Sequence, residues 1–206
     1  MSLEKTLYLV DFSDCTAAII AGGASTRMGG LPKGHIPVNG EPILAHLKKV
    51  LAALFPRTIL ICNDPARYAS FGLETFPDVI ADKGAPAGVH AALAHAPSDW
   101  IFAVGCDMPF VYPAAVQWMG AQRAHTYDAI VAAHKGRIES LHAFYRTTAF
   151  PAFDAAIRAG TPSFRDILHK VRTKTIPERD LLAAAMPLRT FWNINTPADL
   201  ARLSKK

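Results

Sequence analysis

The 206-residue sequence has few cysteines and no long hydrophobic run. Its three cysteines, Cys15, Cys62 and Cys106, lie far apart without a C-x-x-C pair, which excludes a zinc knuckle and a dense disulfide framework. No uncharged apolar run reaches the roughly 18 residues that a membrane-spanning helix needs, and Glu4 and Lys5 interrupt the N-terminal segment. We therefore expect no membrane anchor, no targeting segment and a cytoplasmic location.

The chain has enough apolar sequence for a sizeable core, because 50% of its residues are hydrophobic and only 19% are charged. Its 22 Lys and Arg residues outnumber its 17 Asp and Glu residues, which gives a formal net charge of +5. This excess suits an anionic partner but is too diffuse to indicate nucleic acid. The eight histidines show no metal-ligand spacing, which disfavours a zinc site. The length predicts a single domain.

Short apolar runs that stop at Gly, Pro or Asp alternate with stretches of helical spacing. The runs are typical of strands buried on both faces of a parallel sheet, and they cover residues 16–21, 58–62, 73–76 and 100–105. Helices are expected at residues 43–55, 87–95, 113–123 and 197–203. The alternation predicts an α/β fold, a mostly parallel twisted sheet with helices on both faces. Beyond Gly136 it weakens, and at most two further strands are expected.

Ligands of such sheets bind at the carboxyl ends of the strands, and the densest chemical signal follows the first predicted strand. The segment from Ala21 to Gly34 reads AGGASTRMGGLPKG. Its glycines would let backbone N–H groups approach a triphosphate, and Arg27 and Lys33 would neutralise that triphosphate. A glycine-rich turn with two solvated basic residues fits the composition equally well. No Gly-Lys-Ser/Thr closes the segment, so it is not a Walker loop.

This segment resembles the L-A-G-G-x-S-x-R-M-G-x-x-K motif of nucleotidyltransferases of the molybdenum cofactor guanylyltransferase (MobA) type. The matching residues are Ile20-Ala21-Gly22-Gly23-Ala24-Ser25-Thr26-Arg27-Met28-Gly29 and Pro32-Lys33. Further matches follow in the same order: Asn63, Asp78, Ala87-Gly88, Cys106-Asp107-Met108-Pro109 and Asn193-Ile194-Asn195-Thr196-Pro197. The resemblance extends from about residue 16 to residue 203.

The resemblance implies a Rossmann-like nucleotidyltransferase fold in one domain, residues 1–206. A nucleotide-binding part would span about 16–110 and an acceptor-side elaboration about 111–206. The implied donor is GTP, the cofactor Mg²⁺ and the acceptor molybdopterin, with transient contacts to cofactor-delivery or acceptor proteins. The implied catalytic residues are Arg27, Lys33 and Asp107, with Asp107 also holding the metal. The implied nucleotide contacts are Ile20, Ala21, Gly22, Gly23, Arg27, Lys33, Asn63, Asp78, Gly88 and Asp107, and the acceptor-phosphate side is assigned to Asn193 and Asn195.

Two carboxylates follow predicted strands, and each has a plain structural alternative. Asp107 at the end of WIFAVGCD suits Mg²⁺, which takes oxygen ligands and bridges to phosphate. Its position two residues before Pro109 also suits a turn aspartate. Asp78 is expected to contact a ribose or base or to support the metal, and a turn role after Pro77 is nearly as plausible. Cys106 is expected to pack in the core, because no thiol activator is evident.

Asn193 and Asn195 would point the same way in an extended segment, where two amides can fix a metal-bound phosphate or its water. The alternative is that Asn195 or Thr196 caps the closing helix. Both roles fit if different residues take them.

The sequence departs from the family pattern at two places. It has Gly84-Ala85-Pro86-Ala87-Gly88 where the family usually reads Gly-Pro-Leu-Ala-Gly, so the proline is displaced by one position in a loop tied to base recognition. It has Glu139-Ser140-Leu141 where the family usually carries His/Gln-Pro-Leu, on the side tied to acceptor binding.

The expected reaction is transfer of GMP from GTP to molybdopterin with release of pyrophosphate. An acceptor phosphate oxygen would attack the α-phosphorus, and base choice would rest on backbone groups of residues 20–23 and 84–88. One alternative keeps the chemistry and changes the substrates, as in a cytidylyltransferase of the same pathway or a sugar-phosphate nucleotidyltransferase. The other is a non-catalytic nucleotide-binding module.

Overall fold

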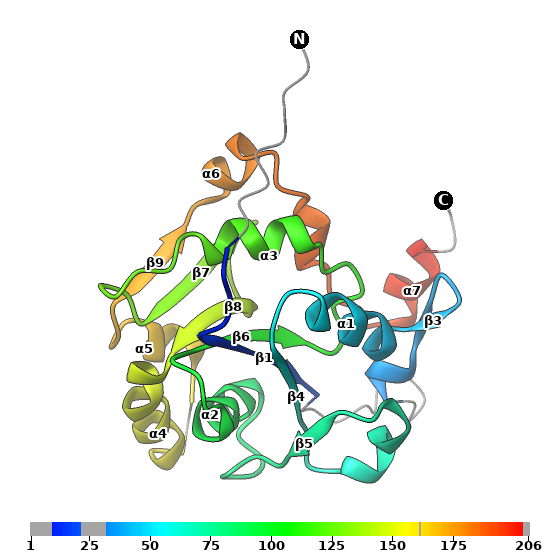
Figure 1. Cartoon of the computed structure of the whole chain (residues 1–206), viewed down its shortest axis with the longest axis horizontal. Coiled ribbons are helices and arrows are strands. Elements are labelled where there is room, and N and C mark those ends of the chain that lie inside the picture. The colour runs from blue at the N-terminus through cyan, green and yellow to red at the C-terminus, as the bar shows by residue number, and fades with distance from the viewer. Residues whose placement is uncertain (1–9, 22–31, 161, 204–206) are drawn as a thin grey trace.

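The structure is a computed structural model that describes residues 10–21, 32–160 and 162–203 (Figure 1). The predicted site residues Gly22, Gly23 and Arg27 therefore lie outside the described residues.

A seven-stranded sheet in the order β5-β4-β1-β6-β8-β7-β9 runs through the centre of the described chain (Figure 1). Its strands are β1 (Cys15–Ile20), β4 (Arg57–Ile61), β5 (Glu74–Phe76), β6 (Trp100–Gly105), β7 (Ala129–His134), β8 (Arg137–Arg146) and β9 (Thr173–Ile176). β1 pairs in parallel with β4 and β6, and the β4–β5 and β7–β9 pairs are also parallel. Only β8 runs antiparallel to its neighbours in this sheet, β6 and β7. The mostly parallel α/β sheet expected from the sequence is confirmed.

Helices cover both faces of this sheet (Figure 1). α1 (Ile43–Ala52) and α3 (Pro113–Gly120) pack on one face. α2 (Ala85–His95), α4 (Phe150–Arg158) and α5 (Phe164–Leu168) pack on the other. The remaining elements are β2 (Pro37–Val38), β3 (Glu41–Pro42), α6 (Glu178–Ala183), α7 (Pro197–Leu203) and the 3-10 helices η2 (Lys33–His35), η3 (Pro65–Phe71), η4 (Thr147–Ala149) and η5 (Leu188–Phe191). No helix in the described ranges is long and apolar enough to cross a membrane.

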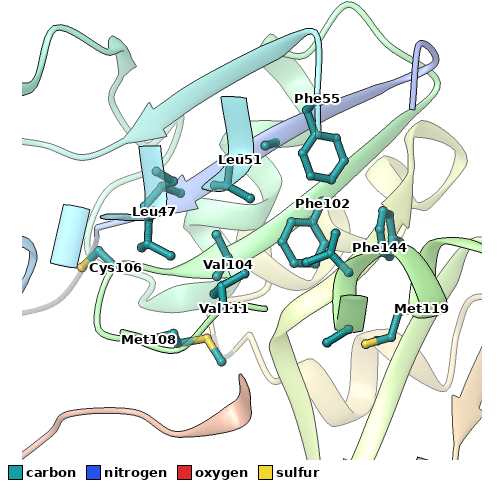
Figure 2. Close-up of a cluster of buried hydrophobic side chains, with 14 of the residues drawn as sticks. Leu47, Leu51, Phe55, Phe102, Val104, Cys106, Met108, Val111, Met119 and Phe144 are labelled. Carbon is teal, nitrogen blue, oxygen red and sulfur yellow. The ribbon is translucent and has the colours of Figure 1, made fainter. Parts of the chain in front are cut away.

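The two faces of the sheet are apolar because successive strand residues point to opposite sides. In β1, Ile19 joins the buried residues next to α1 and α3, called here the α1–α3 core, whereas Ile20 joins those next to α2 and α4, the α2–α4 core. Figure 2 shows part of the α1–α3 core, in which the rings of Phe55 and Phe102 stack 5.6 Å apart. Burial on both faces explains why these strands appear in the sequence as continuous apolar runs.

Element boundaries differ from the sequence expectations at informative places. The strand at 100–105 and the helix at 197–203 are confirmed. The helix expected at 113–123 ends at Gly120, where a Cβ would lie 2.5 Å from the ring of Phe12. The expected loop at 84–88 is largely the first turn of α2, which begins at Ala85. Beyond Gly136 the two further strands are β8 and β9.

The order of the strands determines where in the sheet a ligand-binding site is expected. The chain moves from β1 to β4 and β5 on one side, and then returns to β6 on the other side of β1. The carboxyl ends of β1 and β6 therefore adjoin at the point where the order reverses, which is where ligands of open α/β sheets bind.

Candidate active site

Three predicted site residues from distant parts of the chain meet beyond the end of β6. Lys33, the first residue of η2, donates from Nζ to Asp107 Oδ2 at 2.7 Å and to Asn195 Oδ1 at 2.7 Å. The backbone N–H of Ile194 donates to the Asp107 carbonyl at 2.9 Å and so ties the Asn195 segment to the strand end. The side chains of Lys33 and Asp107 are 27% and 17% exposed, so the pair is shielded yet open to a ligand.

The Asp107 carboxylate is placed by a tight turn at the end of β6. The N–H of Met108 donates to the Gly105 carbonyl at 3.2 Å, and the N–H of Cys106 donates to the Ile20 carbonyl at 3.1 Å. A Cβ at Gly105 would lie 2.6 Å from Asp107 Oδ1, so glycine leaves room for the carboxylate. Cys106 itself is buried, and burial raises the pKa of its thiol to about 12. The packing role expected for Cys106 is confirmed, because such a thiol stays protonated and unreactive.

The oxygen donors at this point suit Mg²⁺ chemically. A carboxylate oxygen and an amide oxygen from separate segments already hold the Lys33 ammonium at 2.7 Å each, which marks a position for positive charge. Within the described ranges no three His, Cys, Asp or Glu side chains cluster as a metal site. Magnesium commonly uses one or two carboxylates and completes its shell with substrate phosphates and water. Asp107 fits that kind of site, in which the nucleotide supplies most of the remaining ligands.

Asn63 and Asp78 form a second pair, at the ends of β4 and β5. Asn63 Nδ2 donates to Asp78 Oδ2 at 2.9 Å, and the Asp78 N–H donates to Asn63 Oδ1 at 2.8 Å. Burial raises the pKa of Asp78 above its ordinary value, and the Asn63 amide opposes that shift. Because β4 and β6 flank β1, this pair and the Lys33–Asp107 pair stand on either side of Ile20 and Ala21.

Gly88 lies at the end of the first turn of α2, where the helix rests on the end of β1. A Cβ on Gly88 would lie 2.4 Å from Ile20 Cγ2, closer than real carbon atoms approach. Glycine at this position therefore lets the start of α2 lie against the strand that leads into the glycine-rich segment. The displaced Pro86 sits in the first turn of the helix, where proline is tolerated.

The two asparagines expected to act together have different partners. Asn195 binds Lys33, whereas Asn193 Nδ2 donates to the Phe191 carbonyl at 3.3 Å. The helix-capping role falls to Thr196, whose Oγ1 accepts from the Asp199 N–H at 3.2 Å while Asp199 Oδ2 accepts from the Thr196 N–H at 2.9 Å. This reciprocal cap leaves the Asn195 side chain to the site.

A cleft of about 880 Å³ opens beside Asn193 and Asn195. Arg189 and Trp192 also line the cleft, although the sequence does not mark them as site residues. The ring of Trp192 stacks on Phe110 at 5.6 Å, and the Arg189 guanidinium lies 3.8 Å from the Phe110 ring centre. No local motif marks these residues, because the wall forms only when separate segments meet. The cleft is also lined by His134, Lys135, Arg137, Glu139, Glu178, Leu188, Phe191 and Asp199.

Solved structures share this architecture. The molybdopterin-guanine dinucleotide biosynthesis protein A of Archaeoglobus fulgidus is 26% identical and superposes with a TM-score of 0.75 over 91% of this chain and 96% of its own. A nucleotidyl transferase of Methanothermobacter, 19% identical with a TM-score of 0.66, shares the fold over 92% of this chain and 95% of its own. The fold, with a lysine, a carboxylate and an amide at the point where strand order reverses, defines a nucleotidyltransferase.

Sequence comparison gives the particular family. A MobA-like NTP transferase domain matches residues 17–175. A protein of Pelotomaculum thermopropionicum named probable molybdenum cofactor guanylyltransferase is 33% identical over 91% of this chain and 90% of its own length. The molybdenum cofactor guanylyltransferase of Vibrio cholerae is 30% identical over 98% of this chain and 97% of its own length. The chain belongs to the MobA-like NTP transferase family.

Proposed function

We propose that the protein transfers GMP from GTP to molybdopterin, with Mg²⁺ as cofactor and pyrophosphate as the leaving group. The observation that carries the proposal is the meeting of Lys33, Asp107 and Asn195 at the junction of β1 and β6. The relatives named molybdenum cofactor guanylyltransferase cover nearly the whole chain, which supports the choice of donor and acceptor.

The residues divide the work as follows. Asp107 would hold Mg²⁺, and the bound ion would supply positive charge next to the phosphates of the nucleotide. Lys33 would turn from Asp107 toward the triphosphate and stabilise the departing pyrophosphate, together with Arg27. Asn195 would keep the Lys33 ammonium in place beside the acceptor phosphate. The attacking phosphate is already ionised at neutral pH, so the reaction needs no protein nucleophile.

The nucleotide and the acceptor would occupy different parts of one domain. The base and ribose would be contacted from the β1 side by residues 20–23 and Gly88. The Asn63–Asp78 pair would lie next to them, at the ends of β4 and β5. Residues from about 111 onward would form the acceptor side, where the cleft next to Asn193 lies. We place the reaction in the cytoplasm, and we expect transient contacts with cofactor-delivery or acceptor proteins.

Pyrophosphate release tests the proposal directly. The wild-type protein is incubated with molybdopterin and each of the four NTPs, with and without Mg²⁺. GTP should give release that depends on both Mg²⁺ and molybdopterin. Release with CTP instead would favour a cytidylyltransferase, and release that needs a sugar phosphate would change the acceptor. Binding of GTP without release under any condition would identify a non-catalytic nucleotide-binding module.

A further inference from the structure

An irregularity in the sheet turns Glu139 into the cleft. On β7 and β8, Ile130 pairs with Phe144, but Ala132 pairs with Glu139. β8 therefore advances by five residues where β7 advances by two, an odd difference. Because side chains alternate between the faces of a sheet, an odd shift in register moves a side chain to the opposite face. Without it, Glu139 would share a face with Ala143 and the α2–α4 core. With it, Glu139 lies opposite Ala132 on the α1–α3 side and lines the cleft.

The irregular segment is held in place from within the core. Tyr145, which is fully buried, donates from Oη to the Ser140 carbonyl at 2.9 Å. Leu141 packs against both cores, and its Cδ1 lies 3.6 Å from the Cβ position of Gly105 at the end of β6. β8 pairs with β6 as far as His142 opposite Val104, so Glu139 lies on the part of β8 that extends beyond this pairing. Bulges that aim a side chain in this way are common beside active sites.

The Glu139 carboxylate lacks a close partner in the described part of the chain. Arg137 and Lys135 act on it electrostatically, but no ion pair or hydrogen bond joins it to a described residue. Burial raises the pKa of Glu139 to about 7 despite these two cations. By contrast, Glu178 in the same cleft is paired, since its carboxylate accepts from the Lys135 N–H at 2.8 Å. A half-buried, unpaired carboxylate in a cleft is suited to accept hydrogen bonds from a ligand.

We infer that Glu139 determines acceptor specificity by accepting two hydrogen bonds from the pterin ring of the acceptor. This inference rests on the proposed function and deepens it. A pterin presents N3–H and the 2-amino N–H side by side, and a carboxylate matches that pair with its two oxygens. Guanine presents the same two donors, so the chemistry alone fits either ring.

The position of Glu139 favours the pterin. The cleft that contains Glu139 is lined by Asn193 and Asn195, but not by Ile20, Asn63, Asp78 or Gly88, where the guanine nucleotide is proposed to bind. β6 also separates β8 from β1 in the sheet. An acceptor phosphate beside Asn193 and Asn195 therefore allows the ring of the same molecule to extend along the cleft toward Glu139, on the side away from the nucleotide.

Two probes separate ring recognition from the reaction. Pterin has the 2-amino group, and lumazine carries an oxo group in its place, which faces a carboxylate unfavourably. Each ring is titrated calorimetrically into the wild type, into Glu139→Gln and into the control Glu74→Gln, which removes a carboxylate from exposed β5 far along the sheet. The wild type and the control should prefer pterin by at least about tenfold, the scale of one charge-assisted hydrogen bond. Glu139→Gln should lose most of that preference.

Kinetics and nucleotide binding complete the test. Glu139→Gln should raise the KM for molybdopterin at least about tenfold, the same scale, with little change in kcat. Its affinities for GTP and for ITP, which lacks the 2-amino group, should equal those of the wild type. An altered GTP-to-ITP ratio would show that Glu139 reads guanine and would overturn the inference.

The same pterin-to-lumazine ratio in wild type and variant, or binding of neither ring by the wild type, would also overturn it. The proposed function fails separately, if the wild type discriminates between the rings but transfers no GMP.

Discussion

The half of the sheet formed by β5, β4, β1 and β6, called here the nucleotide side, and the half formed by β8, β7 and β9, the acceptor side, are named after their proposed ligands and are built differently. On the nucleotide side, β5, β4, β1 and β6 are parallel, and the polar residues directly after them are already paired, as in Asn63–Asp78 and Lys33–Asp107. On the acceptor side, β8 is antiparallel and its register with β7 is irregular. Glu139 on β8 lines the cleft and has no hydrogen-bond or ion-pair partner among the described residues. A paired set of groups holds its geometry before the ligand arrives, whereas an unpaired group gains a partner only from the ligand. The first arrangement suits the transfer step itself, and the second suits selection of one acceptor.

The largest expected effect comes from the nucleotide side. Asp107→Asn should lower kcat/KM by roughly 100–1,000-fold, because it removes the charge that would hold Mg²⁺ where negative charge develops. The fold should remain, since the carboxylate lies at a strand end and outside the apolar core. Pyrophosphate release and thermal unfolding measure the two effects.

Asp99→Asn is the matched control, because Asp99 precedes the same strand and pairs with Arg146 at the opposite end of the sheet. Activity near that of the wild type in Asp107→Asn would remove Asp107 from the metal role.

Lys33→Ala should weaken GTP binding, slow turnover, or both, by an amount equivalent to roughly 1.5–3 kcal/mol. The variant removes the ammonium that bridges Asp107 and Asn195 and that is proposed to contact the triphosphate. Lys49→Ala serves as control, because the Lys49 side chain on α1 is 73% exposed and pairs with Glu41 of β3. Unchanged GTP affinity together with unchanged turnover would show that Lys33 does not act on the triphosphate.

A moderate loss of stability is expected when a buried hydrogen bond next to the cleft is removed. Thr190 Oγ1 and His142 Nε2 form a buried hydrogen bond of 2.9 Å that joins η5 to β8. Burial lowers the pKa of His142 to about 4, so its ring is neutral near pH 7. Thr190→Val should reduce the free energy of unfolding by roughly 1–3 kcal/mol, because it removes the hydroxyl that is bonded to His142 and that also accepts from the Tyr112 N–H at 3.4 Å.

Thr58→Val is the matched control, since Thr58 Oγ1 is buried without a hydrogen-bond partner in the described chain. That variant should be neutral or stabilising. An equal loss of stability in both valine variants would show that the His142 hydrogen bond contributes nothing.

The smallest expected effect is a pH-dependent change in stability at Glu139. Its pKa is raised from 4.5 to about 7 on folding, so the folded state is favoured below the lower value and loses this advantage as the pH rises through 7. Glu139→Gln should therefore melt above the wild type at about pH 8 and close to it at about pH 5. The other titratable side chains of the cleft, His134, Lys135, Arg137, Glu178, Arg189 and Asp199, are present in both proteins. A difference that does not vary with pH would contradict the burial of this carboxylate.

The nucleotide side could be predicted from sequence because its features are local. One apolar run predicts the strand at 100–105, and the residues after that run place Asp107 at the strand's end. The glycine-rich segment in turn points to Lys33 as a phosphate-binding residue. Gly88 lies inside α2, in agreement with the helix expected at residues 87–95, but the close approach of that helix to Ile20 depends on packing that no local pattern records.

The acceptor side depends on contacts between distant segments. Arg189 and Trp192 both pack against Phe110, which lies about 80 residues earlier in the chain. The Trp192 ring stacks on the Phe110 ring, and the Arg189 guanidinium lies over it. The face on which Glu139 lies depends on an irregular register between β7 and β8, and strict alternation would place it on the other face. Asn193 and Asn195 both line the cleft, but only Asn195 contacts Lys33, whereas Asn193 donates to the Phe191 carbonyl. That division depends on tertiary contacts such as the one between the Ile194 N–H and the Asp107 carbonyl, which the sequence does not reveal.

The choice of base tests the account most directly, because we propose that it rests on backbone groups of residues 20–23 and 84–88, and because it would define the reaction as guanylyl transfer. A competition titration of GTP, ATP, CTP and UTP with Mg²⁺ on the wild-type protein measures it. Guanine offers an acceptor at O6 beside donors at N1 and N2, and a base with the reversed pattern leaves backbone groups unpaired at roughly 1–3 kcal/mol each. GTP should therefore bind at least about tenfold more tightly than each of the others. CTP binding as tightly as GTP would contradict the account and favour a cytidylyltransferase.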